Sequence, residues 1–135
     1  MGYRSEVVLV VGKEVMPQFM VTMAKSPDAR SLCFAEAKRR EDYDGKGNML
    51  FAWDCIKWYD SYEGIRAIAD FMDWCLGEKV PVSDEQRAAD KSSTPAAHID
   101  ADECFRFIRI GEETDDIEEM GCGFWNVGVS RSIVF

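Results

Sequence analysis

Residues 5–11, Ser-Glu-Val-Val-Leu-Val-Val, decide the fold of this chain. Five consecutive β-favouring apolar residues follow Glu6, and Gly12 ends the run. A strand that is apolar at every position, and not only at alternate positions, is typical of a strand buried on both faces. The stretch therefore predicts an interior strand of a sheet, and the remaining elements have to be placed around it.

Two helices are predicted directly after this strand. Over residues 15–25, methionine and phenylalanine recur at helical spacing, and Pro17 suits a first helical turn. The sequence Ser26-Pro27-Asp28 combines a capping residue, a proline and an early acid, which is typical of a helix start. An apolar stripe continues from there toward Arg40, so the second helix is expected to reach that residue.

A third helix is predicted over residues 62–76, which carry the clearest apolar stripe in the chain. Gly77 follows at the position of a left-handed C-terminal cap. Three further strands are predicted over 49–59, 104–111 and 125–135. We expect the last two to form a hairpin whose tip is the acidic stretch 112–119.

This order of elements predicts an α+β fold: a two-layer sandwich of one four-stranded mixed sheet with helices on one face. A length of 135 residues fits a single domain over residues 1–135. Residues 78–102 contain two prolines, no aromatic residue and the tract Lys91-Ser92-Ser93-Thr94-Pro95. They predict a flexible loop or insertion.

The charge balance excludes several classes of function. The chain carries 16 basic and 25 acidic side chains, for a net charge of −9. Direct binding of nucleic acid needs a basic face, and a membrane span needs about 20 apolar residues in a row. We therefore expect neither partner. Residues 1–40 carry a net positive charge, whereas residues 41–135 carry a strongly negative one. Such an uneven charge distribution would orient a charged protein partner as it approaches.

Cysteine usage indicates a reducing compartment. Five cysteines, an odd number, are spaced far apart without a Cys-x-x-Cys pair, and His98 is the only histidine. This pattern predicts free thiols in the cytoplasm and no metal site. Cys122, between two glycines, lies near Glu118 and Glu119, which would raise its pKa and weaken it as a nucleophile. No catalytic residues and no cofactor are predicted, because no catalytic or phosphate-binding motif occurs.

Six acids in eight residues make the stretch 112–119 the first candidate binding surface. They are Glu112, Glu113, Asp115, Asp116, Glu118 and Glu119. A calcium site is disfavoured, because the stretch has no glycine and lacks the spacing of oxygen ligands that calcium loops use. Two interpretations remain: a solvated hairpin end, or a row of carboxylates that imitates nucleic-acid phosphates on the basic surface of a partner.

Two other groups of residues compete with the acidic stretch. Trp58, Tyr59 and Tyr62 lie at a strand-to-helix junction and are either binding anchors or, as large aromatics, parts of a small core. Arg4, Arg109 and Arg131 lie in or beside predicted strands and either gather into an anion site or pair with nearby acids. Arg106 is three positions from Arg109, so an unbulged strand places the two on opposite faces.

Four segments together carry a resemblance to known proteins. They are Met1-Gly2-Tyr3-Arg4-Ser5, Ile56-Lys57-Trp58-Tyr59-Asp60-Ser61-Tyr62, Phe105–Glu112 running into Asp115–Glu119, and Val129-Ser130-Arg131-Ser132-Ile133. The combination resembles a family of small uncharacterised proteins encoded by tailed bacteriophages. The resemblance covers about a third of the chain, and residues 78–102 look like an insertion relative to shorter members. It implies expression in the cytoplasm of an infected bacterium, and it implies no activity and no catalytic residue.

Three functional hypotheses follow. The first is a non-enzymatic phage accessory protein that binds and modulates a host protein, in host takeover or anti-defence, through an acidic surface that imitates nucleic acid. Its partner would be a bacterial host protein with a basic surface. The second is a protein that binds or sequesters a nucleotide or another small anion on Arg4, Arg109 and Arg131. The third is an enzyme of unrecognised type.

Overall fold

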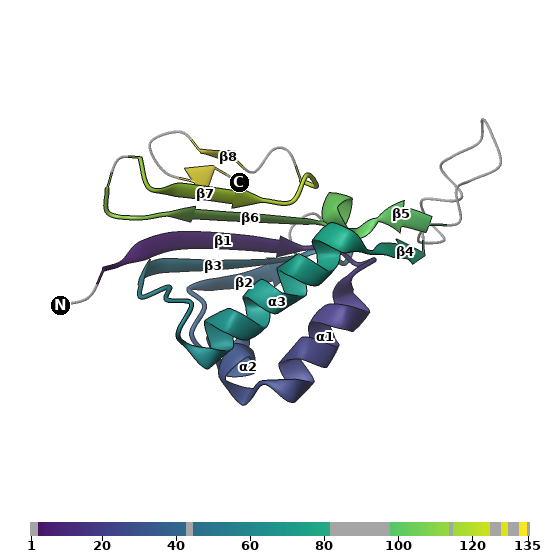
Figure 1. The fold of residues 1–135 in the computed structure, drawn as a ribbon, viewed down its shortest axis with the longest axis horizontal. Coiled ribbons are helices and arrows are strands. Elements are labelled where there is room, and N and C mark those ends of the chain that lie inside the picture. The colour runs from purple at the N-terminus through teal and green to yellow at the C-terminus, as the bar shows by residue number, and fades with distance from the viewer. Residues whose placement is uncertain are drawn as a thin grey trace.

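The computed structural model describes residues 3–42, 45–81, 98–113, 115–124, 128–129 and 133–134 (Figure 1). Five strands form an antiparallel sheet in the order β2-β3-β1-β6-β7, and two short strand pairs, β4-β5 and β8-β9, stand outside it. In chain order the elements are β1 (Ser5–Val11), α1 (Met16–Lys25), α2 (Pro27–Phe34), β2 (Arg39–Asp42), β3 (Met49–Ile56), α3 (Glu63–Gly77), β4 (Lys79–Pro81), β5 (His98–Asp100), the 3-10 helix η1 (Ala101–Cys104), β6 (Phe105–Ile110), β7 (Ile117–Met120), β8 (Gly128–Val129) and β9 (Ile133–Val134).

Strand β1 is the centre of the sheet, as its sequence predicts. It pairs with β3 on one side and with β6 on the other. Val7, Leu9 and Val11 belong to the core on the helix face, and Val8 and Val10 to a second cluster on the opposite face. All five are at most 1% exposed, so the prediction of a strand buried on both faces is confirmed.

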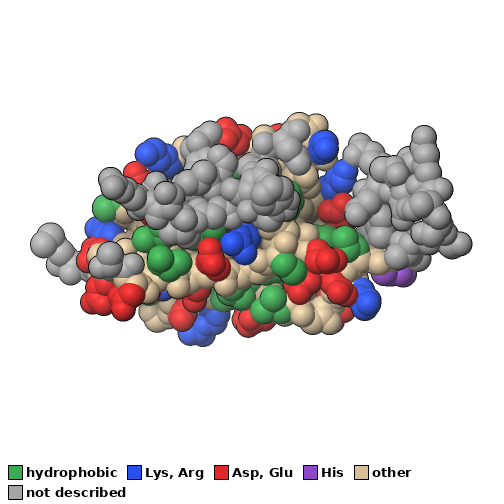
Figure 2. Space-filling model, turned by 90° about the horizontal axis from the view of Figure 1, so that it is seen from above, with side chains coloured by type: hydrophobic (Ala, Val, Ile, Leu, Met, Phe, Trp, Pro, Cys, Tyr) green, Lys and Arg blue, Asp and Glu red, His purple; other side chains and the backbone are tan. Residues whose placement is uncertain are grey.

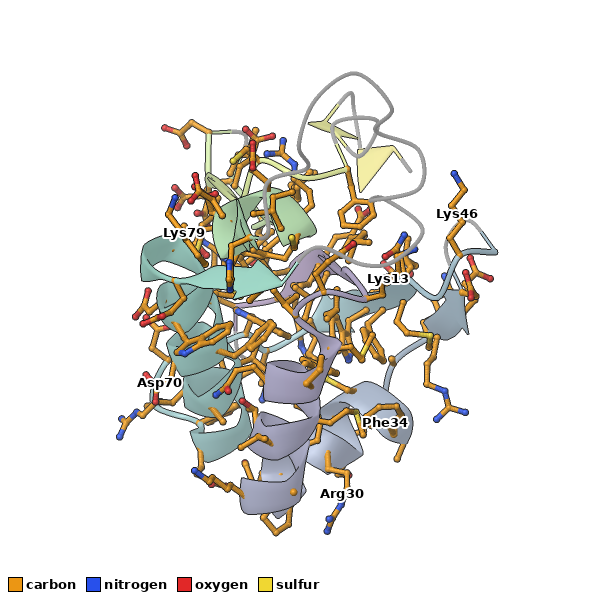
Figure 3. The ribbon with its side chains drawn as sticks, turned by 90° about the vertical axis from the view of Figure 1, so that its right-hand side faces the viewer. Lys13, Arg30, Phe34, Lys46, Asp70 and Lys79 are labelled. Atoms are coloured by element: carbon orange, nitrogen blue, oxygen red, sulfur yellow. The ribbon has the colours of Figure 1, made fainter. Side chains whose placement is uncertain are left out.

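All three helices cover the same face of the sheet (Figure 1). The core beneath them is built mainly of phenylalanine rings, and Figure 3 shows how side chains fill the space between helices and sheet. Phe19 of α1 contacts Phe51 of β3 and Phe71 of α3, with ring centroids 5.5 and 5.3 Å apart. Aromatic pairs at these separations add to the free energy gained by burial, so they fix α1 and α3 against the sheet.

The opposite face carries the smaller cluster of Val8, Val10, Leu50, Ala52 and Ile108. Phe124 packs against this cluster, and β9 runs next to β1. In Figure 3 the yellow strands β8 and β9 lie on the side of the sheet away from the helices. The α+β class and the placement of the helices on one face are therefore confirmed.

The predicted four-stranded mixed sheet is wrong in two respects. The sheet has five strands, and all of its pairings are antiparallel. The additional edge strands β2 and β7 have the sequences Arg-Arg-Glu-Asp and Ile-Glu-Glu-Met. Edge strands are often charged, because charge discourages pairing with other chains, and such sequences lack the apolar signal of an interior strand.

The hairpin partner of β6 is also different from the prediction. Strand β6 pairs with β7, which lies inside the acidic stretch, with Phe107 opposite Met120 and Ile110 opposite Ile117. Within 125–135, the described residues form only β8 and β9, which pair with each other. Residues 125–127, 130–132 and 135 lie outside the described part of the chain.

Helix α2 ends at Phe34, six residues before the predicted end. The carbonyl oxygens of its last turn accept hydrogen bonds from side chains of the sheet. Trp53 donates from Nε1 to the carbonyl of Leu32 at 2.9 Å, and Arg40 donates to the carbonyl of Phe34 at 2.7 Å. Because the sheet satisfies these carbonyls, the chain is free to leave the helix and continue as β2.

Strand β3 ends at Ile56, three residues earlier than predicted. Cys55 has a φ of 55°, and the register with β1 shifts between Ser5 and Val7. This irregularity is a β-bulge, which moves the following side chain to the other face. Ile56 therefore packs against the helix-side core, and not beside Leu50 as strict alternation would place it.

Two expectations around the end of α3 also need correction. Gly77 is the last residue of the helix and not a left-handed cap; in the described segments, the glycines with positive φ are Gly45, Gly47 and Gly121. The predicted loop 78–102 is structured at both ends, because β4 pairs with β5 and η1 follows. Residues 82–97 lie outside the described part.

No helix in the described segments is long and apolar enough to cross a membrane.

Candidate functional site

The turn between β6 and β7 folds back tightly on itself. Gly111 donates from its backbone nitrogen to the carbonyl of Asp116 at 2.8 Å, and Asp116 donates to the carbonyl of Glu113 at 3.1 Å. β7 then pairs with β6, so that Glu118 lies opposite Arg109 and Glu119 opposite Ile108. The acidic stretch is thus a turn followed by an edge strand, which we call the acidic edge (residues 112–119).

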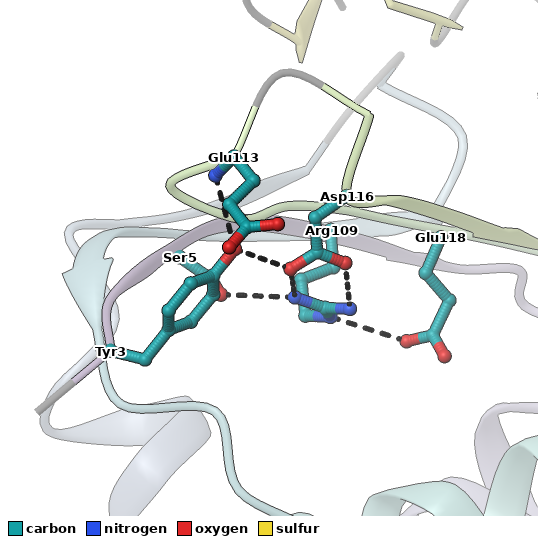
Figure 4. A network of polar contacts seen from close by, with 6 residues as sticks. All are labelled: Tyr3, Ser5, Arg109, Glu113, Asp116 and Glu118. Atoms are coloured by element: carbon teal, nitrogen blue, oxygen red, sulfur yellow. Dashed lines mark hydrogen bonds and ion pairs between the residues drawn. The ribbon is translucent and has the colours of Figure 1, made fainter.

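Arg109 is the hub of a polar network on the helix side of this hairpin (Figure 4). Its guanidinium donates to both carboxylate oxygens of Asp116, at 3.1 and 2.9 Å, and to Glu118 at 3.4 Å. It also donates to the hydroxyl of Ser5 at 3.2 Å. The bidentate bond from Arg109, together with a bond from Tyr3, lowers the pKa of Asp116 below its ordinary value.

The residues before β1 add further hydrogen bonds to the network. Tyr3 donates from its hydroxyl to Asp116 at 2.6 Å and accepts a bond from the backbone nitrogen of Glu113 at 3.1 Å. The backbone nitrogen of Arg4 donates to the carboxylate of Glu112 at 3.0 Å. Hydrogen bonding to Asp116 raises the pKa of Tyr3. Segments more than 100 residues apart in sequence are therefore joined at one end of the sheet.

Arg106 anchors the hairpin from the other face. Its guanidinium donates to the carbonyl of Gly121 at 2.9 Å and to the carboxylate of Glu119 at 3.3 Å. Arg106 and Arg109 thus point to opposite faces, as the spacing predicts. Each arginine binds one glutamate of β7, so this strand is held from both faces of the sheet.

The acidic edge combines fixed and free carboxylates. Four of its acids have intramolecular partners: Glu112, Asp116, Glu118 and Glu119. The side chains of Glu113 and Asp115 are exposed and contact no described residue through a hydrogen bond or ion pair. Ile117, between the acids, is 45% exposed. Figure 2 shows red and blue side chains next to each other at the left-hand end of the molecule, where the hairpin turn lies.

The aromatic junction divides into a core part and a surface part. Trp58 packs with Trp53 and Phe107, with ring centroids 5.2 and 5.8 Å away, and belongs to the core margin. Tyr59 and Tyr62 pair with each other at 5.2 Å, and Tyr62 is 45% exposed. The core interpretation therefore applies to Trp58, and Tyr62 presents its ring at the surface.

A pocket of about 610 Å³ opens beside Tyr62. It is lined by α2, by the first turn of α3, by the segment 56–62, which begins at the last residue of β3, and by Arg4. The sequence analysis identified Arg4 and Tyr62 as candidates but did not predict the pocket. The other lining residues come from α2, from α3, from the end of β3 and from the connecting segments, and only the tertiary packing of these parts brings them together.

The arginine anion site receives little support from the contacts. Arg109 is already bound to two carboxylates, and the side chain of Arg4 donates to the carbonyl of Cys55 at 3.2 Å. Arg131 lies outside the described residues. An anion at Arg109 would have to displace Asp116, and the anion-binding hypothesis stays a prediction.

The thiols show a clear division by burial. Cys33, Cys75 and Cys104 are buried, and burial raises the pKa of each to about 12. Cys55 and Cys122 are exposed. Cys122 also has a raised pKa, caused by partial burial and by Asp102, where the sequence analysis named Glu118 and Glu119. No group of three metal-ligating side chains occurs in the described residues.

Comparisons of the chain with protein-family models, with curated proteins and with solved structures give no match. Two of the segments quoted for the resemblance contribute to the network around Arg109: Tyr3 and Ser5 come from one, and Arg109 and Asp116 from another. A third, at 56–62, lines the pocket. Sequence reasoning missed Tyr3 and Ser5, whose one signal was their place in a resembling segment.

Proposed function

We propose that this protein is a non-enzymatic binding protein that presents its acidic edge to a basic surface of a bacterial host protein. The observation that carries the proposal is the exposed edge strand β7, which has carboxylates on both faces and ends the sheet order of the described strands. A strand at the edge of a sheet offers backbone hydrogen-bonding groups to an added strand.

The chemistry of the edge selects the partner. Glu118 and Glu119 lie on opposite faces of β7 beside the exposed Ile117. Lysine and arginine side chains on an incoming strand would meet these acids, whereas a second copy of β7 would meet like charge. The network around Arg109 holds the edge in one conformation, which reduces the entropy lost on binding. The phage resemblance supports a bacterial protein as the partner.

The test uses the two free acids, because their substitution does not break the network. The wild-type protein, Glu113→Gln/Asp115→Asn and the control Asp70→Asn/Asp73→Asn are immobilised and exposed to bacterial lysate. The control removes the same charge from the exposed face of α3.

We expect the wild-type protein and the control to retain one host protein in stoichiometric amount, and the Glu113/Asp115 variant to retain several-fold less. Retention should fall as salt rises, because charges at a surface are screened within about 10 Å at 0.1 M ionic strength. Equal retention by all three proteins, unaffected by salt, would exclude the acidic edge as the binding surface.

A further inference from the structure

We infer that the pocket between α2 and α3 binds a short zwitterionic peptide, of two or three residues with apolar side chains. The pocket volume of about 610 Å³ lies in the range of sites that enclose small molecules. Its floor is apolar and consists of Leu32, Ile56 and Ile65. Leu32 and Ile65 are almost fully buried, so a ligand resting on them would exclude water from the remaining exposed surface.

The basic and the acidic side chains around this floor come from different parts of the chain. The basic side chains, Arg4 and Lys57, come from the segments flanking β1 and β3. The acidic side chains, Asp28, Glu36 and Glu63, come from α2, from the segment after it and from the start of α3. In the described part of the chain, none of the five forms an ion pair with another.

A ligand with both signs of charge complements this arrangement. Its carboxylate would bind Lys57 and the guanidinium N–H groups of Arg4 that the bond to the Cys55 carbonyl leaves available, and its ammonium group would bind the carboxylates in and beside the helices. A nucleotide or another polyanion is disfavoured, because three carboxylates line the pocket against two cations. An extended dipeptide or tripeptide spans about 7 to 10 Å, so its two charged ends are able to contact different elements of the pocket while its apolar middle lies on the floor.

Hydroxyl groups and an aromatic ring complete the recognition surface. Ser31 and Ser61 line the pocket and are able to hydrogen-bond peptide groups of the ligand. The exposed ring of Tyr62 is backed by Tyr59 and offers a face to an apolar side chain or to the ammonium group.

Two walls of the pocket, α2 and the start of α3, are packed directly against each other. A side chain at Gly64 would meet the backbone of Asp28 within 2.9 Å, so the start of α3 lies directly against α2. Ser26 adds a hydrogen bond to Glu63 at 3.1 Å. A rigid pocket loses little entropy on binding, which favours the affinity of a small ligand.

The experiment titrates the whole protein with leucyl-leucine, followed by amide chemical shifts in NMR spectra. The same dipeptide with an amidated carboxyl group, and with both ends blocked, serves for comparison. The variants are Lys57→Gln and the control Lys25→Gln, which removes an exposed lysine from α1. Neither lysine side chain forms a hydrogen bond or ion pair with a described residue, so both variants are expected to fold.

We expect saturable binding with shifts centred on α2 and residues 56–65, and at least tenfold weaker binding of the doubly blocked dipeptide. Lys57→Gln should weaken leucyl-leucine binding about fivefold or more and leave binding of the amidated form unchanged. Lys25→Gln should change neither. The inference is overturned by an absence of saturation up to about 10 mM, by equal binding of the blocked form, or by equal effects of the two lysine variants.

Discussion

Gly111 is the residue on which the network around Arg109 depends most directly. A β-carbon at this position would overlap the carboxylate of Asp116 and the hydroxyl of Tyr3. The close approach of these two groups therefore requires a residue without a side chain. Sequence reasoning placed Gly111 only at the end of a strand, because nothing local indicates that Tyr3, more than 100 residues away, packs against it.

Replacing Gly111 with alanine should destabilise the protein by about 1–3 kcal/mol, because either Asp116 or Tyr3 must move and the network is lost. Gly77→Ala is the matched control. Apart from its neighbours in the helix, no described residue lies within 4 Å of a β-carbon added at Gly77, and the position is helical, where alanine is favoured. Urea unfolding measures both, and an equal, small effect at the two positions would contradict the proposed packing.

Asp116 gives the network a defined dependence on pH. Its pKa is lowered in the folded protein, mainly by Arg109 and then by Tyr3. A carboxyl group of this kind contributes stability that is complete above its ordinary pKa, near 4, and is lost as the pH falls through the lower folded value. Wild-type stability should therefore drop more between about pH 6 and pH 3 than that of Asp116→Asn, as measured by urea midpoints. A constant difference between the two proteins would show that Asp116 does not titrate as described.

At the scale of elements, the helices and strands with long buried apolar faces were predicted most accurately from the sequence. The strand at residues 5–11 and the helix near 62–76 were recognised because their apolar patterns are uninterrupted. The strands β2 and β7 were missed, since Arg-Arg-Glu-Asp and Ile-Glu-Glu-Met carry no apolar alternation. β2 pairs with the following strand β3, and β7 is held against β6 by bonds from Arg106 and Arg109, so both strands depend on their neighbours in the sheet.

The capping residue between α1 and α2 connects two elements at once. Ser26 accepts a hydrogen bond from the backbone nitrogen of Ala29 at 3.2 Å and donates one to Glu63 of α3. Ser26→Ala should lower the free energy of unfolding by about 1 kcal/mol, as expected for loss of a helix cap. Ser31→Ala, at an exposed position of α2, should change it little, and equal losses in thermal unfolding would argue against the cap.

At the scale of the whole molecule, burial separates the five thiols into two classes. Cys33, Cys75 and Cys104 are buried and have pKa values near 12, whereas Cys55 and Cys122 are exposed. The sequence predicted free thiols, but the apolar neighbours of Cys55 do not indicate the bulge that turns this side chain outward.

A thiol-specific reagent at pH 8 should therefore label two cysteines quickly in the native protein and all five in denaturant. Of the exposed pair, Cys55 should react first, because the pKa of Cys122 is raised. Mass spectrometry of digested samples identifies the labelled positions. Rapid labelling of Cys33 or Cys75 in the native protein would contradict the core described above.

The central claim is that the acidic edge (residues 112–119) is ordered and held by arginines, and amide hydrogen exchange tests it most directly. The β7 amides that bond to β6 should exchange at least about a hundredfold more slowly than in an unstructured peptide, because pairing protects them. Asp116→Asn should reduce this protection while β1 and β3 keep theirs. Exchange of 117–120 at the rate of an unstructured chain in the wild-type protein would contradict the claim, and with it the proposed binding surface.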